Sequence, residues 1–592
     1  MALVFLPVSC DEMRGRGWYY YDFLLVTGDA YVDHPSFGAA VIGRVLESRG
    51  YRVAVLAQPQ SSKYFSNMGM PRIAVLVTGG NIDSMVANYT AAKKRRSGDE
   101  YSPRDGLRPD RASLVYSRMA RTAFGESVKI ILGGLEASLR RFAHYDYWDD
   151  AVRPSYLIDA DADVLVYGMG ERAILQLAER IKRKMDYCDI RGICYRSTEY
   201  PEGDIAVCEP FETVVRDKFA YCRAFMTQYN EQDAETGRTV VQAHGDELLV
   251  QNPPAAPLSE SELDTFAGLP YTRAAHPMYK DGIKALEEVK FSITHNRGCF
   301  GACNFCSIAF HQGRVVTARS HDSVIEEARS LTEQPDFKGY IHDVGGPTAN
   351  FRHRACNSKA MCKHRSCLVP EPCPKLNTDS LDYVSLLRKL REIPNIKKVF
   401  VRSGLRYDYL LLDKHDLLLS ELVKHHISGQ LKVAPEHCAP NVLKLMNKPK
   451  WEKYLEFESK FDRLNKRYGK KQFVVPYLIS SHPGCTLDDA VNLAETLHKM
   501  GRHPEQVQDF YPTPGTLSTC MYYTGLNPRN MKPVYVARTQ NEKAMQRALL
   551  QWKRPDKRKQ VIAALHKAGR DDLIGYGKGC LVRPIKKSSK SH

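Results

Sequence analysis

The sequence predicts an α/β protein built from two consecutive series of alternating strands and helices. Short apolar runs that end in glycine or a polar turn recur along the chain, and an amphipathic stretch follows most of them. Such alternation is typical of parallel sheets covered by helices. With 592 residues the chain is also too long for one core, so we expect roughly two to four domains.

The first series, residues 1–208, predicts a doubly wound, Rossmann-like sheet. Its strands are expected at 23–27, 53–57, 73–78, 129–132 and 164–167. Ligands of such sheets bind beyond the carboxyl ends of the strands, but none of the turns there is the Gly-x-Gly-x-x-Gly fingerprint of dinucleotide sites. The segment 33–38 is similar to the loop of cobalamin-binding domains, with His34 one position early. A helix-opening loop capped by Ser36 is the alternative.

Residues 209–285 are expected to connect this sheet to a second series, residues 286–524. Strands are predicted at 289–294, 339–343, 398–402, 430–434, 473–479 and 507–511. Helices are predicted at 322–333, 381–392, 414–426, 441–446 and 487–500. Six such units make an open partial (βα)6 barrel, whose active site should lie at the carboxyl ends of its strands.

The end of the chain, residues 525–592, is strongly basic. It holds 17 Lys and Arg against 4 Asp and Glu, so +13 of the net charge of +17 lies here. Two helices are expected, at 538–552 and 556–567. The charge predicts either a surface that faces RNA or another polyanion, or a solvated helical face with a frayed tail.

Three cysteines directly follow the first strand of the second series. Cys299, Cys303 and Cys306 have the spacing Cys-x3-Cys-x2-Cys, with the aromatic Phe305 before the last. Three thiolates can ligate three irons of a [4Fe–4S] cubane, whose full ligation needs four. An open metal position is typical of a reactive site.

A second group of cysteines lies in a basic insert, residues 351–377. Its members are Cys356, Cys362, Cys367 and Cys373. Four thiols this close predict a second metal site. The Cys-x2-Cys pairs usual for structural zinc are absent, so an auxiliary iron–sulfur cluster and zinc both stay open.

The barrel and the triad together resemble the radical S-adenosylmethionine (radical SAM) superfamily. The resemblance implies that the open iron binds S-adenosylmethionine, which is cleaved reductively to a 5′-deoxyadenosyl radical. It also implies a low-potential electron donor of the flavodoxin or ferredoxin type. The whole chain resembles the YgiQ family of radical SAM proteins, through residues 5–7, 26–38, 133–150, 297–307, 401–406, 434–437 and 511–516.

The same resemblance indicates candidate residues for S-adenosylmethionine. Gly345 and Gly346 stand where the superfamily has Gly-Gly-Glu, with Pro347 in place of the acid. Ser403 and Arg406 follow the third barrel strand and are expected to contact ribose and carboxylate. After the fourth strand, Glu436 and His437 are candidate ribose contacts or catalytic proton donors, or form a helix cap.

We therefore expect a cytoplasmic radical SAM enzyme that modifies a macromolecule, RNA being the candidate. Segments 433–446 and 508–516 resemble methylthiotransferases that act on tRNA or a ribosomal protein. The alternatives are a cobalamin-dependent radical SAM methylase and a nucleic-acid-binding iron–sulfur redox sensor. No membrane partner is expected, because no apolar run is long enough to cross a bilayer.

Overall fold

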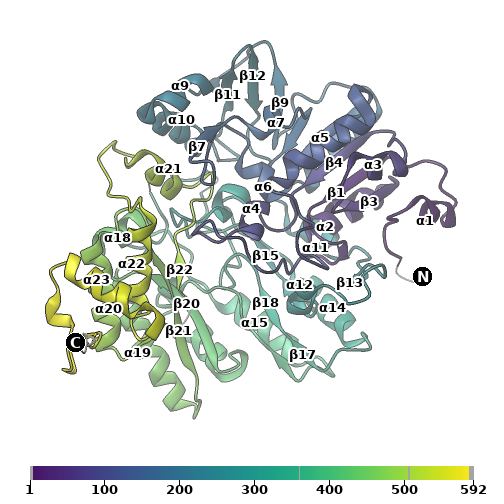
Figure 1. Cartoon of the computed structure of the whole chain (residues 1–592). Helices are drawn as coiled ribbons and strands as arrows, with labels where there is room; N and C mark the ends of the chain where they lie inside the picture. Colours follow the sequence, from purple (N-terminus) through teal and green to yellow (C-terminus); the bar gives the residue numbers. More distant parts are fainter. Residues whose placement is uncertain (1–3, 359, 364, 505–506, 586–592) are drawn as a thin grey trace, which may run out of the picture.

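The computed structural model describes residues 4–358, 360–363, 365–504 and 507–585. A sheet with helices on both faces forms the N-terminal part, and a barrel-like unit lies against it (Figure 1). The C-terminal helices lie on the outer side of the barrel-like unit. No helix within the described ranges is both long and apolar enough to span a membrane.

The N-terminal sheet has nine strands in the order β10-β11-β12-β9-β8-β5-β4-β1-β3. Its parallel strands are β1 (Phe23–Thr27), β3 (Val53–Ala57), β4 (Ala74–Thr78), β5 (Lys129–Gly133) and β8 (Val164–Val166). The prediction of a doubly wound sheet is therefore confirmed. These strands are buried on both faces and for that reason appear as continuous apolar runs in the sequence.

Helices cover both faces of this sheet. α2 (Gly38–Glu47) and α8 (Glu171–Lys182) pack together on one face, and α3 (Ser62–Met68) and α5 (Ala112–Phe124) pack on the other. Alternate residues of β1 enter different cores: Leu24 joins the core that includes α3 and α5, and Leu25 joins the one that includes α8.

Within residues 209–285, which were expected to be a connector, β11 and β12 instead enlarge the N-terminal sheet. α9 (Phe211–Arg216) and α10 (Lys218–Asn230) precede β11 (Thr239–His244) and β12 (Glu247–Gln251). β12 pairs antiparallel with β9 (Ile193–Ser197). The apolar residues of this hairpin are buried against the sheet, which explains why it docks there instead of forming a tether.

The second unit has the predicted parallel order of six strand positions. They are β14 (Ser292–Thr294), β17 and β18 (Tyr340–Ile341 and Asp343–Gly345), β19 (Lys398–Val399), β20 (Gln430–Glu436), β21 (Phe473–Ser480) and β22 (Gln508–Asp509). β18 pairs with β14, β17 with β19, and β20 with β21, which pairs with β22. A parallel bridge between Leu405 and Val433 joins the third position to the fourth.

The barrel helices lie close to their expected positions. They are α14 (His321–Thr332), α15 (Leu381–Arg391), α17 (Leu417–Glu421) with the π-helical turn Leu422–His426, α18 (Pro440–Met446) and α20 (Leu487–Lys499). One long helix, α19 (Trp451–Arg467), was not predicted. It buries an apolar stripe that includes Tyr454, Phe457 and Phe461.

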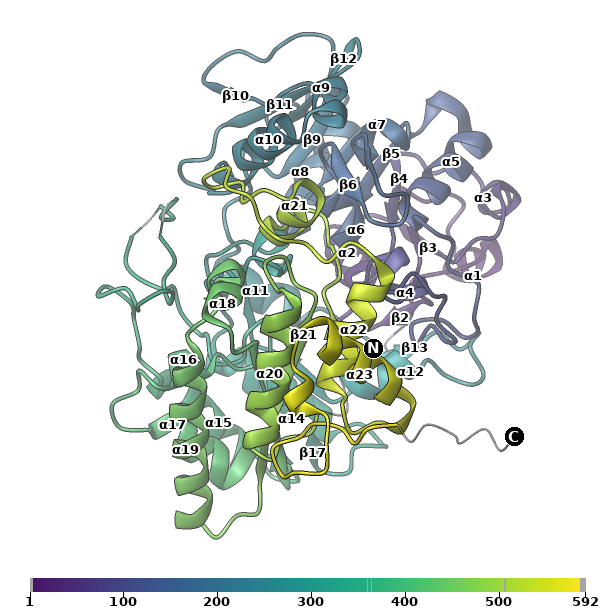
Figure 2. The same ribbon diagram turned by 60° about the vertical axis from the view of Figure 1, so that its left-hand side comes forward.

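The C-terminal region contributes α21 (Leu517–Thr524), α22 (Gln540–Leu550) and α23 (Arg558–Lys567), so both predicted helices are present. α22 contacts α20 and α23, and the three lie side by side in both views (Figures 1 and 2). α21 instead reaches the N-terminal part, where the Tyr523 ring stacks on Tyr145 with centroids 4.7 Å apart.

The remaining elements are short. They are α1 (Cys10–Gly15), β2 (Val32–Asp33), α4 (Ser84–Asn88), α6 (Gly134–Leu139), β6 (His144–Asp146), β7 (Ala151–Arg153), α7 (Tyr156–Asp159), β10 (Ile205–Val207), α11 (Glu260–Ala267), β13 (Ala274–Ala275), α12 (Lys284–Val289), β15 (Asn296–Arg297), α13 (Ile308–His311), β16 (Thr317–Ala318) and α16 (Tyr407–Leu410).

Candidate functional site

The cysteine triad lies on a loop between β15 and α13, just past the first barrel strand. The loop opens at Gly298, whose φ is +79° and whose missing Cβ would lie 2.1 Å from the carbonyl oxygen of Val315, so only glycine fits. Side-chain amides of neighbouring segments hold it in place. Asn447 Nδ2 donates to the Ala302 carbonyl at 2.7 Å, and Asn304 Nδ2 donates to the carbonyl of Leu445 at 2.8 Å.

The three cysteines are half-buried and lie within electrostatic reach of one another. Burial raises the pKa of the Cys299 thiol and raises that of Cys306 to about 12, where the charges of Cys303 and Cys299 add to the effect. The Cys299 sulfur lies 3.2 Å from Thr348 Oγ1, and Arg406 Nη1 lies 3.5 Å from the Cys303 sulfur. Thiols this shielded become thiolates when a metal replaces their protons.

The space between the thiols has the character of a ligand cradle. A Cβ on Gly301 would lie 3.2 Å from the Cys299 sulfur and 2.6 Å from Arg406 Nη1, so a side chain here would fill it. The three thiols thus suit three corners of a cubane cluster. Within the described ranges, no three His, Cys, Asp or Glu side chains converge on a single-ion position. The assignment of the triad to a cluster therefore stays a prediction.

A cavity of about 700 Å³ opens beside the triad loop. Arg297, two residues before Cys299, lines it, and so does Ile308, two residues after Cys306. Of the residues predicted to bind S-adenosylmethionine, Gly345, Gly346 and Ser403 line it as well. The structure thus brings the glycine pair and Ser403 to the same space as both flanks of the triad.

The glycine pair is packed too tightly for any other residue. A Cβ on Gly345 would lie 2.2 Å from Ser403 Oγ, and one on Gly346 would lie 1.6 Å from Asn296 Oδ1. The same Asn296 donates through Nδ2 to the carbonyl of Thr348 at 3.0 Å, and Thr348 contacts Cys299. The sequence did not mark Asn296, which couples the glycine strand end to the triad.

Arg406 and Glu436 lie on another side of the thiols and do not line the cavity. Arg406 forms a two-point ion pair with Asp408, at 2.6 and 2.8 Å, and donates to the Gly301 carbonyl at 3.1 Å. Burial raises the pKa of Glu436, which lies 3.8 Å from Lys448 Nζ. The predicted contacts of these two residues with S-adenosylmethionine remain predictions.

His437 and His34 do not line the cavity. His437 Nδ1 accepts from the Ala439 amide at 3.0 Å and its Nε2 lies 3.4 Å from Cys485, so it serves the start of α18. Burial lowers its pKa to about 4. His34 is fully buried and does not line the cavity. The expected Ser36 cap of α2 is also absent, because Asn81 Oδ1 accepts from the Gly38 amide instead.

The cysteine-rich insert packs directly on the triad loop. Leu368 and Val369 share an apolar cluster with Phe300 and Phe351, whose rings stack 3.7 Å apart. Burial raises the pKa of Cys367, and the thiols of Cys356, Cys362 and Cys373 raise it further. The other three thiols therefore lie within electrostatic reach of Cys367, but among the described residues no three of these cysteines converge on one metal position. Which metal they bind, if any, stays a prediction.

Sequence reasoning missed that the N-terminal sheet supplies the opposite wall of the cavity. Ser36, Asn81, Gly134 and Glu171 from this sheet line it together with the barrel residues. The glycine turns after β4, β5 and β8 were signals that a ligand edge is present. Their meeting with the barrel depends on packing between distant segments.

A partial barrel of six strands, with a cysteine triad past its first strand and a glycine-lined cavity, defines a radical SAM protein. Residues 5–292 match the radical SAM N-terminal family model, residues 293–497 match the radical SAM superfamily model, and residues 505–592 match a domain of unknown function. The resemblance that the sequence suggested is thus confirmed.

The chain belongs to the UPF0313 protein family. It is 54% identical over 593 residues to a UPF0313 protein of Clostridium perfringens. The matched region covers 98% of this chain and 89% of that protein. A UPF0313 protein of Clostridium botulinum is 53% identical, with coverages of 98% and 92%. The chain is therefore a radical SAM enzyme of unknown reaction, with a [4Fe–4S] cluster and S-adenosylmethionine as cofactors.

Solved structures are more distant. The radical S-adenosylmethionine methyltransferase TsrM from Kitasatospora setae, with cobalamin and a [4Fe–4S] cluster bound, is 15% identical, with a TM-score of 0.48 and coverages of 84% and 77%. The cobalamin-dependent S-adenosylmethionine radical enzyme OxsB, with aqua-cobalamin bound, is 11% identical, with a TM-score of 0.49 and coverages of 95% and 73%.

Proposed function

We propose that Cys299, Cys303 and Cys306 hold the cluster of this radical SAM enzyme and that its substrate reacts in the cavity beside them. The observation that carries the proposal is that the cavity is lined by both flanks of the triad loop and by the glycine strand end. When bound, the reduced cluster supplies the electron that cleaves S-adenosylmethionine to a 5′-deoxyadenosyl radical.

The residues of the chain supply position and shelter from water. Gly345 and Gly346 allow Ser403 and Asn296 to pack closely against the end of β18, which shapes this edge of the cavity. Asp343 holds this edge by accepting from the amides of Arg402 at 2.7 Å and Ser403 at 3.1 Å. Arg406 places a buried positive charge 3.5 Å from the Cys303 sulfur.

Reductive cleavage after anaerobic reconstitution tests the proposal. Wild-type protein supplied with iron, sulfide and a low-potential reductant is expected to form 5′-deoxyadenosine from S-adenosylmethionine. Cys303→Ala is expected to form none, and Cys580→Ala, which removes a thiol near the C-terminus, is expected to match the wild type. Equal product from Cys303→Ala and wild type would refute the assignment of the triad.

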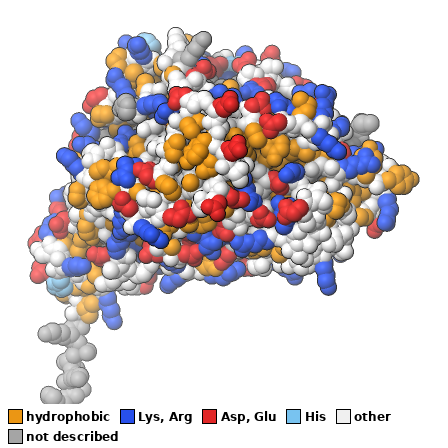
Figure 3. Space-filling model, turned by 90° about the horizontal axis from the view of Figure 1, so that it is seen from above, with side chains coloured by type: hydrophobic (Ala, Val, Ile, Leu, Met, Phe, Trp, Pro, Cys, Tyr) orange, Lys and Arg blue, Asp and Glu red, His pale blue; other side chains and the backbone are white. Residues whose placement is uncertain are grey.

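The finer proposal is a macromolecular substrate, with RNA as the candidate. Its support is the positive charge of residues 525–592. Some of these basic side chains, however, contact other residues of the chain. Burial lowers the pKa of Lys543 to about 8, and its Nζ lies 2.6 Å from Tyr522 Oη. Arg547 Nε donates to Asp509 at 2.7 Å. The face seen from above mixes acidic, basic and apolar side chains (Figure 3).

RNA binding can be separated from catalysis by salt. A polyanion contact made by the basic region should weaken steeply as salt rises. We expect Lys559→Glu on α23 to weaken RNA binding and Lys182→Glu, on α8 of the N-terminal part, to leave it unchanged. Binding that is insensitive to both salt and Lys559→Glu would remove the RNA proposal.

Two competing proposals and the partners follow from the same chain. A redox sensor would bind RNA without forming 5′-deoxyadenosine, so the cleavage assay separates it from the enzyme. A cobalamin-dependent methylase would need a corrinoid in the cavity, so a protein that binds no corrinoid would exclude this proposal. We also propose a flavodoxin- or ferredoxin-type electron donor and a cytoplasmic location, which accords with the oxygen sensitivity of such clusters.

A further inference from the structure

The N-terminal wall of the cavity lies where doubly wound sheets bind their own ligands. The parallel strands lie in the sheet in the order β3-β1-β4-β5-β8. Numbered by their order along the chain, these five strands therefore have the spatial order 2-1-3-4-5. The order reverses between β1 and β4. In open sheets, the crevice beyond the strand ends at such a reversal is the expected ligand site, and this strand order is typical of mononucleotide-binding sheets.

We propose that a second ligand, a cofactor that joins an apolar ring system to a phosphorylated sugar, binds this wall. Gly80 and Asn81 after β4 and Ser36 and Gly38 at the start of α2 all line the cavity. These residues flank the reversal point. The inference rests on the proposed function in one respect, which is that S-adenosylmethionine binds at the barrel wall of the cavity and the second ligand at the N-terminal wall.

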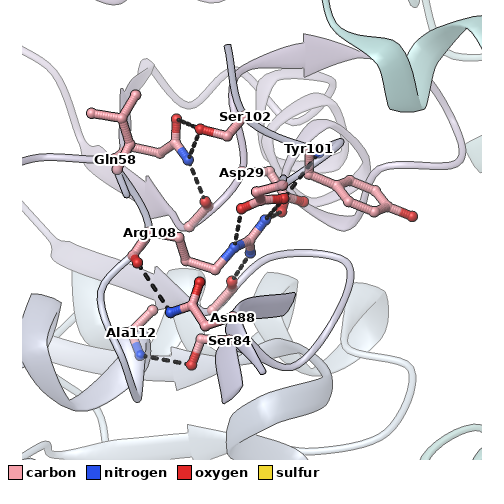
Figure 4. Close-up of polar contacts among 12 residues, drawn as sticks. Asp29, Gln58, Ser84, Asn88, Tyr101, Ser102, Arg108 and Ala112 are labelled. Carbon is pink, nitrogen blue, oxygen red and sulfur yellow. Dashed lines mark hydrogen bonds and ion pairs between the residues drawn. The ribbon is translucent and has the colours of Figure 1, made fainter. Parts of the chain in front are cut away.

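A buried ion network prepares the wall for a ligand (Figure 4). Arg108, 1% exposed, donates to Asp29 at 2.8 Å, to Asp99 at 2.8 Å and to the carbonyl of Gly79 at 2.6 Å. Asp29 in turn accepts from the Asn81 amide at 2.7 Å. A Cβ on Gly80 would lie 2.2 Å from Asp29 Oδ1, so the turn cannot shift without breaking the network.

Asn81 carries this order to the start of α2. Its Nδ2 donates to the Ser36 carbonyl at 2.9 Å, and its Oδ1 accepts from the Gly38 amide at 3.0 Å. The wall is thus fixed before any ligand arrives, which lowers the entropic cost of binding.

The start of α2 suits an anionic group. The helix has ten residues and its N-cap, Phe37, makes no side-chain capping bond. The amides of the first turn form the positive end of the helix dipole, which favours a phosphate, although the Gly38 amide already donates to Asn81 Oδ1. Across the cavity, Arg297 makes no ion pair with any side chain in the described part of the chain.

A second and independent observation indicates hydroxyl or amide donors on the ligand. Glu171, the first residue of α8, is 5% exposed and lines the cavity, yet its Oε2 has no hydrogen-bond partner among the described residues. A buried carboxylate oxygen without a donor is costly, and the hydroxyl groups of a sugar are donors that a carboxylate can accept.

Apolar side chains line part of the cavity. Both units contribute them: Ile42, Val166, Ile174, Ile293 and Ile308. The barrel wall also carries polar residues, His342, Asp343 and Arg402. A cavity that combines polar groups with apolar side chains suits a ring system attached to a phosphorylated sugar. Flavin mononucleotide and cobalamin both carry that chemistry, and the volume of about 700 Å³ lies within the usual range for cofactor sites, about 300–1,000 Å³.

Binding measurements on the reconstituted full-length protein test the inference. Hydroxocobalamin and flavin mononucleotide are titrated separately under anaerobic conditions, with S-adenosylmethionine present. We expect one of them to bind with one-to-one stoichiometry and a micromolar or tighter Kd. Absence of binding by both would overturn the inference. If that protein still forms 5′-deoxyadenosine, the proposed function stands alone.

A matched pair of variants tests where the phosphate lies. Gly38 is exposed, and a Cβ there would have only Asn81 Oδ1 within 4 Å, at 4.0 Å, so both substitutions fit. Gly38→Asp is expected to weaken binding at least tenfold more than Gly38→Asn. Equal binding by the two variants would overturn the phosphate assignment. Glu171→Gln, as a second check, should weaken the bound cofactor without changing cluster content, and unchanged affinity would contradict the role of Glu171.

Discussion

The ion pair beside the triad offers the sharpest test of the site's energetics. In Arg406→Met, the Asp408 carboxylate loses its two-point partner, and both side chains are 8% exposed. Breaking one side of a buried pair costs about 3–5 kcal/mol, because a charge is left buried without compensation. Removing both charges, in Arg406→Met/Asp408→Asn, should cost clearly less than the single change.

Urea-dependent proteolysis of the apoprotein measures this difference locally. A chain with several domains does not unfold in one step, so a global transition would mix contributions. Cleavage of a transiently open segment reports the local free energy of opening. We expect cleavage at Tyr407–Leu410 to require less urea in Arg406→Met and to recover in the double variant.

The control is an ion pair whose arginine is exposed and whose carboxylate has a second partner. Arg388 pairs with Glu421 at 2.9 Å, the Arg388 side chain is 55% exposed, and Glu421 also pairs with Arg391 at 2.7 Å. Arg388→Met should cost less than about 1 kcal/mol. If Arg406→Met costs no more than Arg388→Met, or if the double variant is as unstable as the single one, the reasoning about this buried pair is refuted.

Three further predictions concern the glycine pair, a buried histidine and the insert. Gly346→Ala should weaken S-adenosylmethionine binding at least about tenfold, because its Cβ would meet Asn296, whereas Gly404→Ala, with nothing within 4 Å, should not; equal affinities by calorimetry would contradict this. The pKa of buried His437 is lowered to about 4 in the folded protein, so the free energy of unfolding should be unaffected by this group above about pH 6.5 and should fall as the pH drops towards 4. His437→Asn should reduce this loss in thermal melts, and an equal loss in both proteins would contradict the prediction. Cys367→Ala should lower iron content by about four per chain relative to Cys580→Ala if the insert binds an auxiliary cluster, and unchanged iron would exclude that cluster.

The fold was largely predictable because its strands are strongly apolar. The segments 23–27 and 53–57 coincide with β1 and β3, because parallel strands buried on both faces appear in the sequence as continuous apolar runs. The failures involve long-range pairing. β12 joins the sheet by pairing Leu248 with Ser197, and no local pattern indicates which distant strand will accept a hairpin. The helix α19 was missed because its N-cap residue, Lys450, forms no side-chain cap and therefore gives no start signal in the sequence.

The candidate site was predictable in its chemistry and only partly in its geometry. The triad and the glycine pair were marked by residue type and spacing. Asn296, which couples them, carries no such mark, because its role depends on a contact across 52 residues with Thr348. The glycine turns of the N-terminal sheet indicated a ligand-binding edge in the sequence. That this edge faces the barrel depends on how the two units pack, which the sequence pattern does not show.

The central claim is that three cysteines leave one iron of the cluster free for S-adenosylmethionine. Electron–nuclear double resonance on the reduced, reconstituted protein with S-adenosylmethionine labelled at its amino nitrogen and carboxylate oxygen tests this directly. The account predicts hyperfine coupling from both labels to the cluster in the wild type. A cluster signal that does not change when the labelled molecule is added, or zinc in place of iron at these thiols, would contradict it.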